Sequence, residues 1–375
     1  MLRLPALALL APALSSAQIE LTEIESIPAG PTTSLRADGQ GYFEKVVIRR
    51  PEALTKLDGL LRLNPALSQV LPALPELLAS ARVSDRFDQL YDRKIRYLQK
   101  GGQLTTHNFY DCATALLMQH PQSGRRLLWV QADMDVVTDG SDPVRYPELS
   151  HYHAARQSDW YLPQTAYQFG STGGLRNPFL DYYPAAEKRL QHYRTLFEKE
   201  READPGFVWR RLLEAVDLQE SRLKTRHLSG PTRRSLLAQE DPFIVLSLDW
   251  FRGSGPWIPK MGDYAAVLYR DQIYPALLGE AGPTFKAGEA SLRLAQHLNP
   301  QASGRVRAID ALEVSYLVFL QTAGPRQAPD LAQWHEKVAH YLEEIGGLGP
   351  GTSLHHWPPL PPKTPAKQPS VDPTR

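Results

Sequence analysis

The spacing of apolar residues along the chain changes near residue 126. Before this point leucines recur at helical intervals, which predicts helices between residues 51 and 100; they include Leu54, Leu57, Leu60 and Leu61. After it, short apolar runs replace the helical period, and each run is typical of a buried strand. The predicted strands cover residues 127–130, 242–246, 264–269, 272–278 and 313–319, and further helices are predicted at about 289–298 and 330–345.

Strands and helices follow one another without regular alternation, which favours an α+β fold over a doubly wound sheet. Arg270-Asp271 separates two predicted strands and predicts a two-residue hairpin. We expect an N-terminal helical region over residues 18–125 and a main domain over residues 126–350. Within that domain, a charged stretch at about 178–240 predicts a helical insertion. The proline-rich residues 351–375 predict a disordered tail.

The composition excludes several classes of function. The 375 residues carry 42 Lys+Arg and 41 Asp+Glu, a net charge of +1, which argues against nucleic-acid binding through a global excess of positive charge. The single cysteine, Cys112, excludes an intramolecular disulfide framework and a Cys-rich zinc site, and we expect it to be buried. No Gly-rich phosphate loop and no Gly-x-Ser-x-Gly motif occurs, so we predict no cofactor.

The first 17 residues have the pattern of a signal peptide. One arginine precedes an apolar run that ends in Ser15-Ser16-Ala17, so we expect cleavage before Gln18. The alternative is a buried N-terminal helix, which Pro5 and Pro12 disfavour. The run is shorter than the roughly 20 residues that a membrane-spanning helix needs. We therefore predict an exported protein, secreted or periplasmic, without a membrane anchor after cleavage.

Four aspartates follow the first predicted strand: Asp133, Asp135, Asp139 and Asp142. Their spacing does not fit a calcium loop of the EF-hand type, because Val137 stands at the middle ligand position. Asp139-Gly140 is a strong turn signal, so the aspartates are explained by a turn alone. A third interpretation is an acidic wall for a cationic sugar polymer, for which Asp135 and Asp139 are the best candidates.

Aromatic residues near these segments are candidates for stacking on sugar rings, although core packing explains them equally. They are Trp160, Tyr161, Tyr167, Trp250, Phe251 and Trp257, and we select Trp160 and Tyr167 as substrate-binding candidates. Two pairs of histidines, 151 with 153 and 355 with 356, lack a carboxylate or a third histidine at usable spacing. We therefore predict surface histidines and no metal site.

The segment from Gly279 to Ser291 contains two carboxylates, Glu280 and Glu289, on either side of a turn with Gly282-Pro283 and Gly288. A strand end and a helix start can present both carboxylates on one rim of a sheet. Two carboxylates that face one cleft are the minimum equipment for hydrolysis of a glycosidic bond. The spacing alone is explained equally by a helix cap and a surface charge.

Several motifs in this part of the chain resemble those of the family-75 glycoside hydrolases, the chitosanases. They are Gly262-Asp263-Tyr264-Ala265-Ala266-Val267, Tyr274-Pro275-Ala276, Gly279-Glu280-Ala281-Gly282-Pro283 and Gly288-Glu289-Ala290-Ser291. The aspartate-rich segment and the strands at 242–246 and 316–319 are also similar to family elements. The resemblance covers about residues 127–176 and 241–324, and it implies a small β-barrel with packed helices. The strand–loop–helix element is also similar to that of double-psi barrels.

The resemblance implies a secreted enzyme that hydrolyses the β-1,4-linked glucosamine polymer internally with inversion. By this resemblance, the family's catalytic pair corresponds to Glu280 and Glu289, which implies Glu289 as general acid and Glu280 as general base. The sequence departs from the family in having Glu280 where aspartate is usual. This departure leaves two alternatives open: a catalytically impaired member that binds cell-wall polysaccharide, and a hydrolase of another glycan such as peptidoglycan.

Overall fold

The computed structural model describes residues 51–99, 111–152, 161–175, 233–282 and 286–358, two isolated positions (178 and 195), and the backbone of short strands before residue 51. These early strands are β1 (Ser26–Ile27), β2 (Thr33–Asp38), β3 (Phe43–Ile48) and β4 (Arg50–Pro51). The predicted signal peptide, nearly all of the predicted helical insertion before residue 233, and the tail from residue 359 lie outside the described residues.

Six strands close into a barrel, in the order β13-β10-β12-β11-β14-β7, with β7 pairing back onto β13. They are β7 (Arg126–Val137), β10 (Phe243–Ser247), β11 (Tyr264–Tyr269), β12 (Gln272–Gly282), β13 (Glu289–Ser291) and β14 (Ile309–Phe319). The pairs β10–β12 and β7–β13 are parallel, and the other barrel pairs are antiparallel. The predicted α+β fold with a small barrel core is confirmed.

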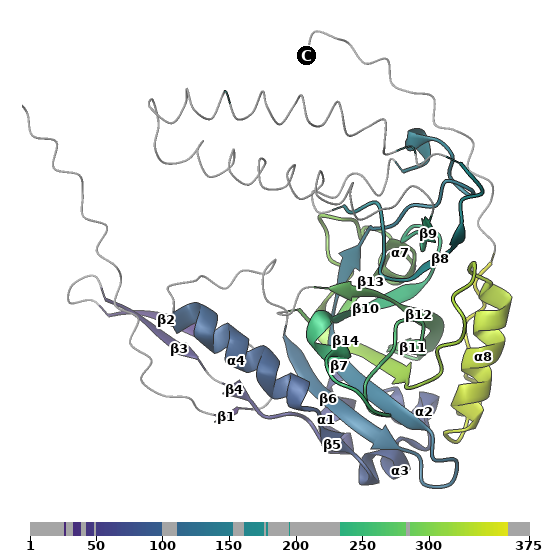
Figure 1. Cartoon of the computed structure of the whole chain (residues 1–375). Coiled ribbons are helices and arrows are strands. Elements are labelled where there is room, and N and C mark those ends of the chain that lie inside the picture. Colours follow the sequence, from purple (N-terminus) through teal and green to yellow (C-terminus); the bar gives the residue numbers. More distant parts are fainter. Residues whose placement is uncertain are drawn as a thin grey trace, which may run out of the picture.

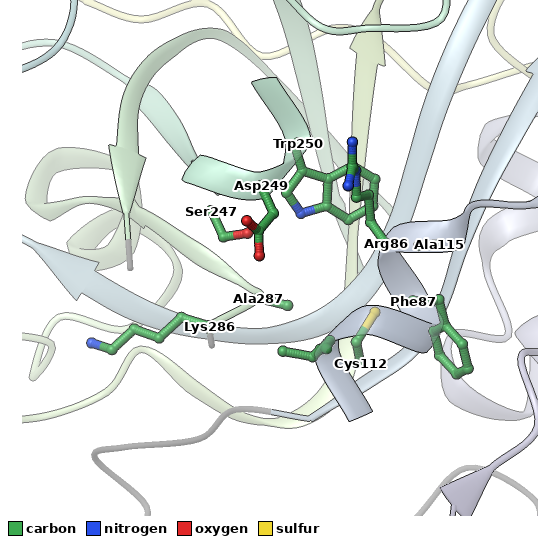
Figure 2. Close-up of a pocket in the computed structure, with 10 residues that line it drawn as sticks. Arg86, Phe87, Cys112, Ala115, Ser247, Asp249, Trp250, Lys286 and Ala287 are labelled. Carbon is green, nitrogen blue, oxygen red and sulfur yellow. The ribbon is translucent and has the colours of Figure 1, made fainter. Parts of the chain in front are cut away.

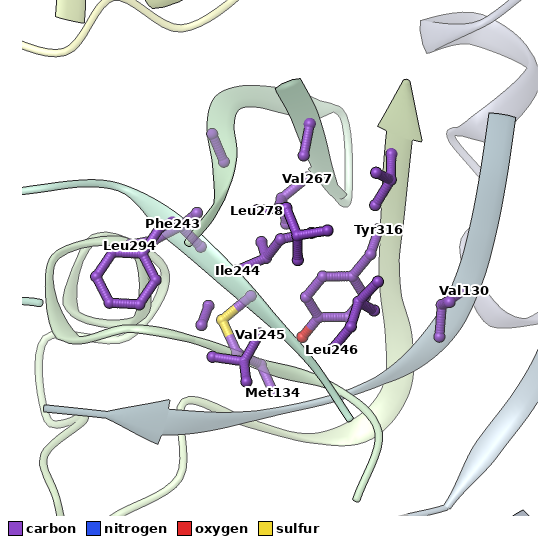
Figure 3. Close-up of a cluster of buried hydrophobic side chains, with 14 of the residues drawn as sticks. Val130, Met134, Phe243, Ile244, Val245, Leu246, Val267, Leu278, Leu294 and Tyr316 are labelled. Atoms are coloured by element: carbon purple, nitrogen blue, oxygen red, sulfur yellow. The ribbon is translucent and has the colours of Figure 1, made fainter. Parts of the chain in front are cut away.

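The barrel interior is filled by side chains from alternate positions of its strands. Val130 and Met134 of β7 point inward, as does Tyr316 of β14, whose hydroxyl donates to the carbonyl oxygen of Asp133 at 2.7 Å. Figure 3 shows these side chains meeting Ile244 of β10. Each such side chain stabilises the fold by about 1.5–3 kcal/mol on burial. The apolar runs of the sequence are therefore explained by this packed interior.

The outer face of the barrel carries a second core, formed with helices. The helices α1 (Leu57–Leu63), α2 (Leu67–Val70) and α3 (Leu74–Ala79) pack with α8 (Leu331–Glu343) against outward-facing residues such as Trp129 and Phe319. Two strands in the same region, β5 (Arg82–Val83) and β6 (Cys112–Gln119), extend the sheet beyond β7. In Figure 1 the helix α4 (Asp85–Gln99) lies along this extension, and α8 lies on the other side of the barrel.

The predicted hairpin between β11 and β12 is confirmed, because Tyr269 pairs with Gln272 across Arg270-Asp271. Arg270 has a φ of 55°, the left-handed conformation that two-residue hairpins require. Asn64 donates through its side-chain amide to the Arg270 carbonyl at 3.1 Å, which ties the hairpin to the end of α1. Cys112 is buried as expected, at 2% exposure.

The remaining short elements lie in the connections between barrel strands. They are the 3₁₀ turns η1 (Leu149–Tyr152) and η3 (Leu248–Phe251), the strands β8 (Gln168–Ser171) and β9 (Arg233–Ser235), which pair, and the helix α7 (Leu292–Leu298). Among the helices that the structure describes, none has the length and apolar character to cross a membrane.

Candidate active site

Glu280 and Glu289 lie on the two strands that flank β10. Val245 of β10 is the register partner of Glu280 on β12 and of Glu289 on β13. Glu289 is in turn the partner of Asp135 on β7. Residues in register across neighbouring strands point to the same face, so the three carboxylates form one row. Strands are spaced about 4.8 Å apart, which puts the Cα atoms of Glu280 and Glu289 roughly 10 Å apart.

A β-bulge aims Glu280 toward this row. Ile244 pairs with Leu278, but the next residue, Val245, pairs with Glu280, so β12 has one extra residue, Gly279, at this point. Leu278 faces the barrel interior, and without the extra residue Glu280 would face it too. A Cβ atom on Gly279 would lie 2.6 Å from Leu236 and 2.8 Å from Phe243. The Gly-Glu pair of the sequence is therefore a bulge followed by the side chain that it re-aims.

Glu289 is positioned by close backbone contacts on both sides. Gly288 has a φ of +77°, and a Cβ atom there would lie 2.3 Å from the carbonyl oxygen of Asp133. The next residue, Glu289, continues as β13, and α7 begins only at Leu292, after Ser291 accepts a hydrogen bond from the Leu294 N–H. The predicted helix start at residue 289 is thus wrong, because the pairing with β7 and β10 holds residues 289–291 extended.

The Glu280 carboxylate accepts two backbone hydrogen bonds. Ala281 N–H donates to Oε1 at 2.7 Å, and Ala166 N–H donates to Oε2 at 2.9 Å. Burial raises the pKa of Glu280 to about 8, although both hydrogen bonds lower it. The carboxylate is thereby fixed in place, with its affinity for a proton increased by the loss of solvent.

The surroundings of Glu289 differ from those of Glu280, because charged side chains lie beside it. A Cβ atom at Gly282 would lie 3.0 Å from Glu289 Oε2, so the carboxylate leans toward β12. Burial raises the pKa of Glu289 to about 7, and the ammonium of Lys286 opposes that rise. Lys286 also lies 3.5 Å from Asp135. Among the described residues, no hydrogen-bond donor is found on the Glu289 carboxylate.

Asp139 lies just beyond the end of β7, close to Glu280 and Glu289. Burial and then the neighbouring charge of Glu280 raise its pKa well above the usual range. Its Oδ1 accepts the Leu162 N–H at 2.8 Å. Asp135 and Asp139, predicted as an acidic wall, are thus brought to the same side of the barrel as Glu280 and Glu289.

Comparison with known protein families matches residues 134–351 to the fungal chitosanases of glycosyl hydrolase group 75. The chain belongs to this family. The suspected family resemblance is confirmed, and the match includes all four carboxylates described above. No curated protein matches the chain. Membership makes the protein a polysaccharide hydrolase by family, and hence a glycoside hydrolase.

The other two aspartates of the acidic segment have structural partners in this member of the chitosanase family. Asp133 pairs with Arg307, and its backbone contacts Gly288 and Tyr316. Asp142 is fully buried and pairs with Arg145 at 2.7 Å and with Arg234 at 2.9 Å. Within the described part of the chain, no group of three or more His, Cys, Asp or Glu side chains is arranged to hold a metal ion.

Of the two aromatic candidates, only Tyr167 lies among the described residues, and it is buried. Tyr167 is only 6% exposed, and its hydroxyl bonds the backbone of Gln327, so its ring belongs to the core. Its backbone N–H donates to the Gly279 carbonyl at 3.0 Å, beside the bulge. Trp160 lies outside the described residues. A sugar-stacking role for either side chain stays a prediction, and the burial of Tyr167 does not favour it.

A small pocket continues the site toward α4 (Figure 2). Ser247, Trp250 and Lys286 line its family-matched side, while Arg86 and Phe87 of α4 line the other. Ser247 is the register partner of Gly282, so the pocket begins one row beyond Glu289. The α4 residues that line this wall come earlier in the sequence than residue 134, where the family match begins.

Sequence reasoning missed the groups that hold the pair. The Ala166 N–H could not be found, because a backbone donor carries no side-chain signature and lies 114 residues from its acceptor. Lys286 stands three residues before Glu289 and was visible, but no role was assigned to it. A cation between two candidate carboxylates is a usable signal, since it lowers the pKa of its neighbours.

Proposed function

We propose that the protein hydrolyses chitosan internally, with inversion, using Glu289 as general acid and Glu280 as general base. The row that places Glu280 and Glu289 on either side of Val245 is the observation that carries this proposal. Inverting glycosidases hold their carboxyl groups roughly 6.5–9.5 Å apart, leaving room for a water molecule. Side chains that start roughly 10 Å apart, with the Glu289 carboxylate leaning toward β12, are compatible with that separation.

The proposed reaction transfers two protons. Glu289 donates its proton to the glycosidic oxygen as the bond from that oxygen to the anomeric carbon breaks. On the opposite face of the sugar, a water oxygen attacks the anomeric carbon and gives one proton to the Glu280 carboxylate. The cycle ends when Glu280 releases its proton to solvent and Glu289 takes one up.

The hydrogen bonds support this assignment of acid and base. Burial raises both pKa values, to about 8 for Glu280 and about 7 for Glu289, and this order alone favours the opposite roles, so the assignment rests on the hydrogen bonds. The two N–H donors on Glu280 favour its ionised form, which is the form a general base needs. Glu289 leans over Val245 and Gly282, an apolar setting that favours the protonated form of a general acid.

The row also supports the choice of substrate. Chitosan is a polymer of glucosamine, which carries ammonium groups, and the half-buried Asp135 stands beside Glu289 in the row. Asp135 is our candidate for contacting a substrate amine next to the cleaved bond. Lys286 Nζ lies 3.5 Å from Asp135, so this carboxylate already has one ammonium group as a neighbour.

Turnover of soluble chitosan tests this proposal. We expect wild-type protein to release new reducing ends, and Glu289→Gln and Glu280→Gln to lose about 10²–10⁴-fold in kcat, as is typical for loss of a general acid or base. Glu336→Gln, an exposed carboxylate on α8, is the matched control and should retain full activity. Wild-type protein that binds chitosan but releases no reducing ends would contradict the proposal and favour a polysaccharide-binding protein. Release from peptidoglycan alone would reassign the substrate.

We further propose that the protein is exported, on the basis of residues 1–17. Expression in a secreting host followed by N-terminal sequencing of the medium or periplasmic fraction tests this. We expect the mature chain to begin at Gln18. Retention of the full-length chain inside the cell would contradict it.

A further inference from the structure

Residues 161–167 form a strap between the end of β7 and the bulge of β12. On the β7 side, Leu162 N–H donates to Asp139 Oδ1 at 2.8 Å, and Gly140 N–H donates to the Leu162 carbonyl at 2.8 Å. On the β12 side, Ala166 N–H donates to Glu280 Oε2 at 2.9 Å. One side chain, Asp139, is thus connected to the Glu280 carboxylate through five residues of backbone.

The strap is fixed at both ends by additional contacts. Tyr161 donates its hydroxyl to the Gly140 carbonyl at 2.8 Å, and Ser141 donates to the Pro163 carbonyl at 2.5 Å. At the other end, Tyr167 N–H bonds the Gly279 carbonyl, and Arg326 donates to the Ala166 carbonyl at 3.2 Å. The strap therefore has little freedom to shift while these contacts hold.

The backbone around Asp139, whose side chain accepts the Leu162 N–H, is tightly constrained. Gly140 has a φ of +112°, and a Cβ atom there would lie 1.7 Å from the Leu236 carbonyl oxygen, so only glycine fits beside Asp139. The Asp139 carbonyl accepts the Ala238 N–H at 3.0 Å, which fixes the aspartate backbone from a third segment. Its side chain is directed at the strap by these surroundings.

We propose that Asp139 is a positioning residue, which holds the strap so that Ala166 N–H donates to Glu280. This inference rests on the proposed function for its consequence in catalysis, but the contact itself is independent of activity. It differs from the sequence prediction of Asp139 as a substrate-binding residue, because here the carboxylate acts on the protein backbone. Asparagine can accept the same hydrogen bond from Leu162, whereas alanine cannot.

Two substitutions separate a positioning role from a charge role. We expect Asp139→Ala to lower kcat about 10–100-fold with little change in KM, since a shift of about 1 Å at a reacting group can cost about 10²-fold. We expect Asp139→Asn to restore most of that loss. The acid limb of the pH profile should move to higher pH in Asp139→Ala and stay in place in Asp139→Asn, because the Ala166 hydrogen bond lowers the pKa of Glu280.

Hydrogen exchange of the Ala166 amide gives a readout without activity. We expect faster exchange in Asp139→Ala than in wild-type protein, and wild-type protection in Asp139→Asn. An Asp139→Asn variant as impaired as Asp139→Ala, or an effect confined to KM, would overturn the inference and favour direct substrate contact. Unchanged exchange in Asp139→Ala would also overturn it. Inactive wild-type protein would contradict the proposed function alone, since the exchange measurement would still decide the role of Asp139.

Discussion

Glu280 depends on two backbone donors for its orientation, and its length is matched to them. Ala281 N–H and Ala166 N–H reach Oε1 and Oε2 at 2.7 and 2.9 Å. Both bonds are made with the length of a glutamate side chain, and an aspartate at this position would end one methylene short. The local backbone therefore accommodates a glutamate at position 280.

The substitution Glu280→Asp tests this match. Shortening the side chain withdraws the carboxylate by about 1 Å and breaks at least one of the two hydrogen bonds, for which a rate loss of about 10²-fold is expected. Steady-state kinetics on soluble chitosan measure the effect. An Asp variant more active than the wild type would mean that the site still favours the family residue.

The raised pKa of Glu280 also predicts how stability depends on pH. Its pKa is about 8 in the folded protein, above the ordinary 4.5, so between these values the folded state binds more protons than the unfolded state. Stability contributed by this group is present below pH 4.5 and is lost as the pH rises through 8.

Glu280→Gln removes this pH dependence. The free energy of unfolding of the variant, relative to that of the wild type, should increase by more than about 1.4 kcal/mol between pH 5 and pH 9. The reason is that a tenfold difference in proton affinity between the folded and unfolded states corresponds to about 1.4 kcal/mol. Urea denaturation at the two pH values measures it. A difference between the two proteins that does not change with pH would be inconsistent with the raised pKa of Glu280.

At the scale of elements, β13 exists because β7 and the Gly288 turn come into direct contact. Asp135 N–H donates to the Gly288 carbonyl at 2.9 Å, which joins the two strands at the start of their parallel pairing. The turn leaves no space for a side chain, since a Cβ atom at Gly288 would meet Asp133. The position of Glu289 thus follows from a glycine that permits two backbones to approach.

Gly288→Ala should therefore destabilise the protein by more than its backbone conformation alone explains. Gly351 has nearly the same φ, +78° against +77°, but its Cβ would have nothing within 4 Å, so Gly351→Ala is a matched control. We expect about 1 kcal/mol for the control and at least about 2–3 kcal/mol for Gly288→Ala, measured by chemical denaturation. Equal losses would show that the close approach to Asp133 carries no weight.

The strands were predictable from sequence where both faces of the strand are covered by other parts of the protein. The run from Tyr264 to Tyr269 matches β11 in full, because burial on both faces selects apolar residues at every position. The extent of β7 was not predictable, since Asp133 and Asp135 lie within the strand although such residues are typical of a loop. The partners of those aspartates come from distant segments, and local pattern carries no record of them.

The site was predictable only in part for the same reason. Glu280 and Glu289 were identified from motifs, but their common row depends on the bulge at Gly279, which is a property of pairing with β10. The strap contact from Ala166 depends on the backbone of a segment more than 100 residues away. Side-chain chemistry therefore pointed to the two candidate carboxylates, and only the fold revealed what holds them.

For the whole molecule, the net charge of +1 conceals a local concentration of carboxylates. Asp135, Glu289 and Glu280 form one row on the barrel, with Asp139 beside it. Basic residues pair with acidic ones elsewhere, as Arg93 of α4 does with Asp249 at 2.5 Å. The substrate proposed above would therefore meet a surface whose charge differs from the average of the chain.

This arrangement predicts a salt-dependent KM. Ions screen attraction between partly exposed charges over about 10 Å at 0.1 M salt, so the attraction of the partly exposed Asp135 for the polymer should weaken, and KM for chitosan should rise between low and high ionic strength while kcat changes little. Initial rates across a salt series at fixed pH measure both constants. A KM that is independent of salt would mean that the carboxylate row does not attract the polymer.

The stereochemistry of cleavage tests the central claim most directly. Proton NMR of glucosamine oligosaccharides during early turnover reports both bond cleavage and the anomer released first. With Glu280 and Glu289 on strands either side of β10, we predict that wild-type protein releases the α-anomer first and that Glu289→Gln releases no product on the same timescale. Release of the β-anomer first, or cleavage that persists in Glu289→Gln, would contradict an inverting reaction carried by this pair.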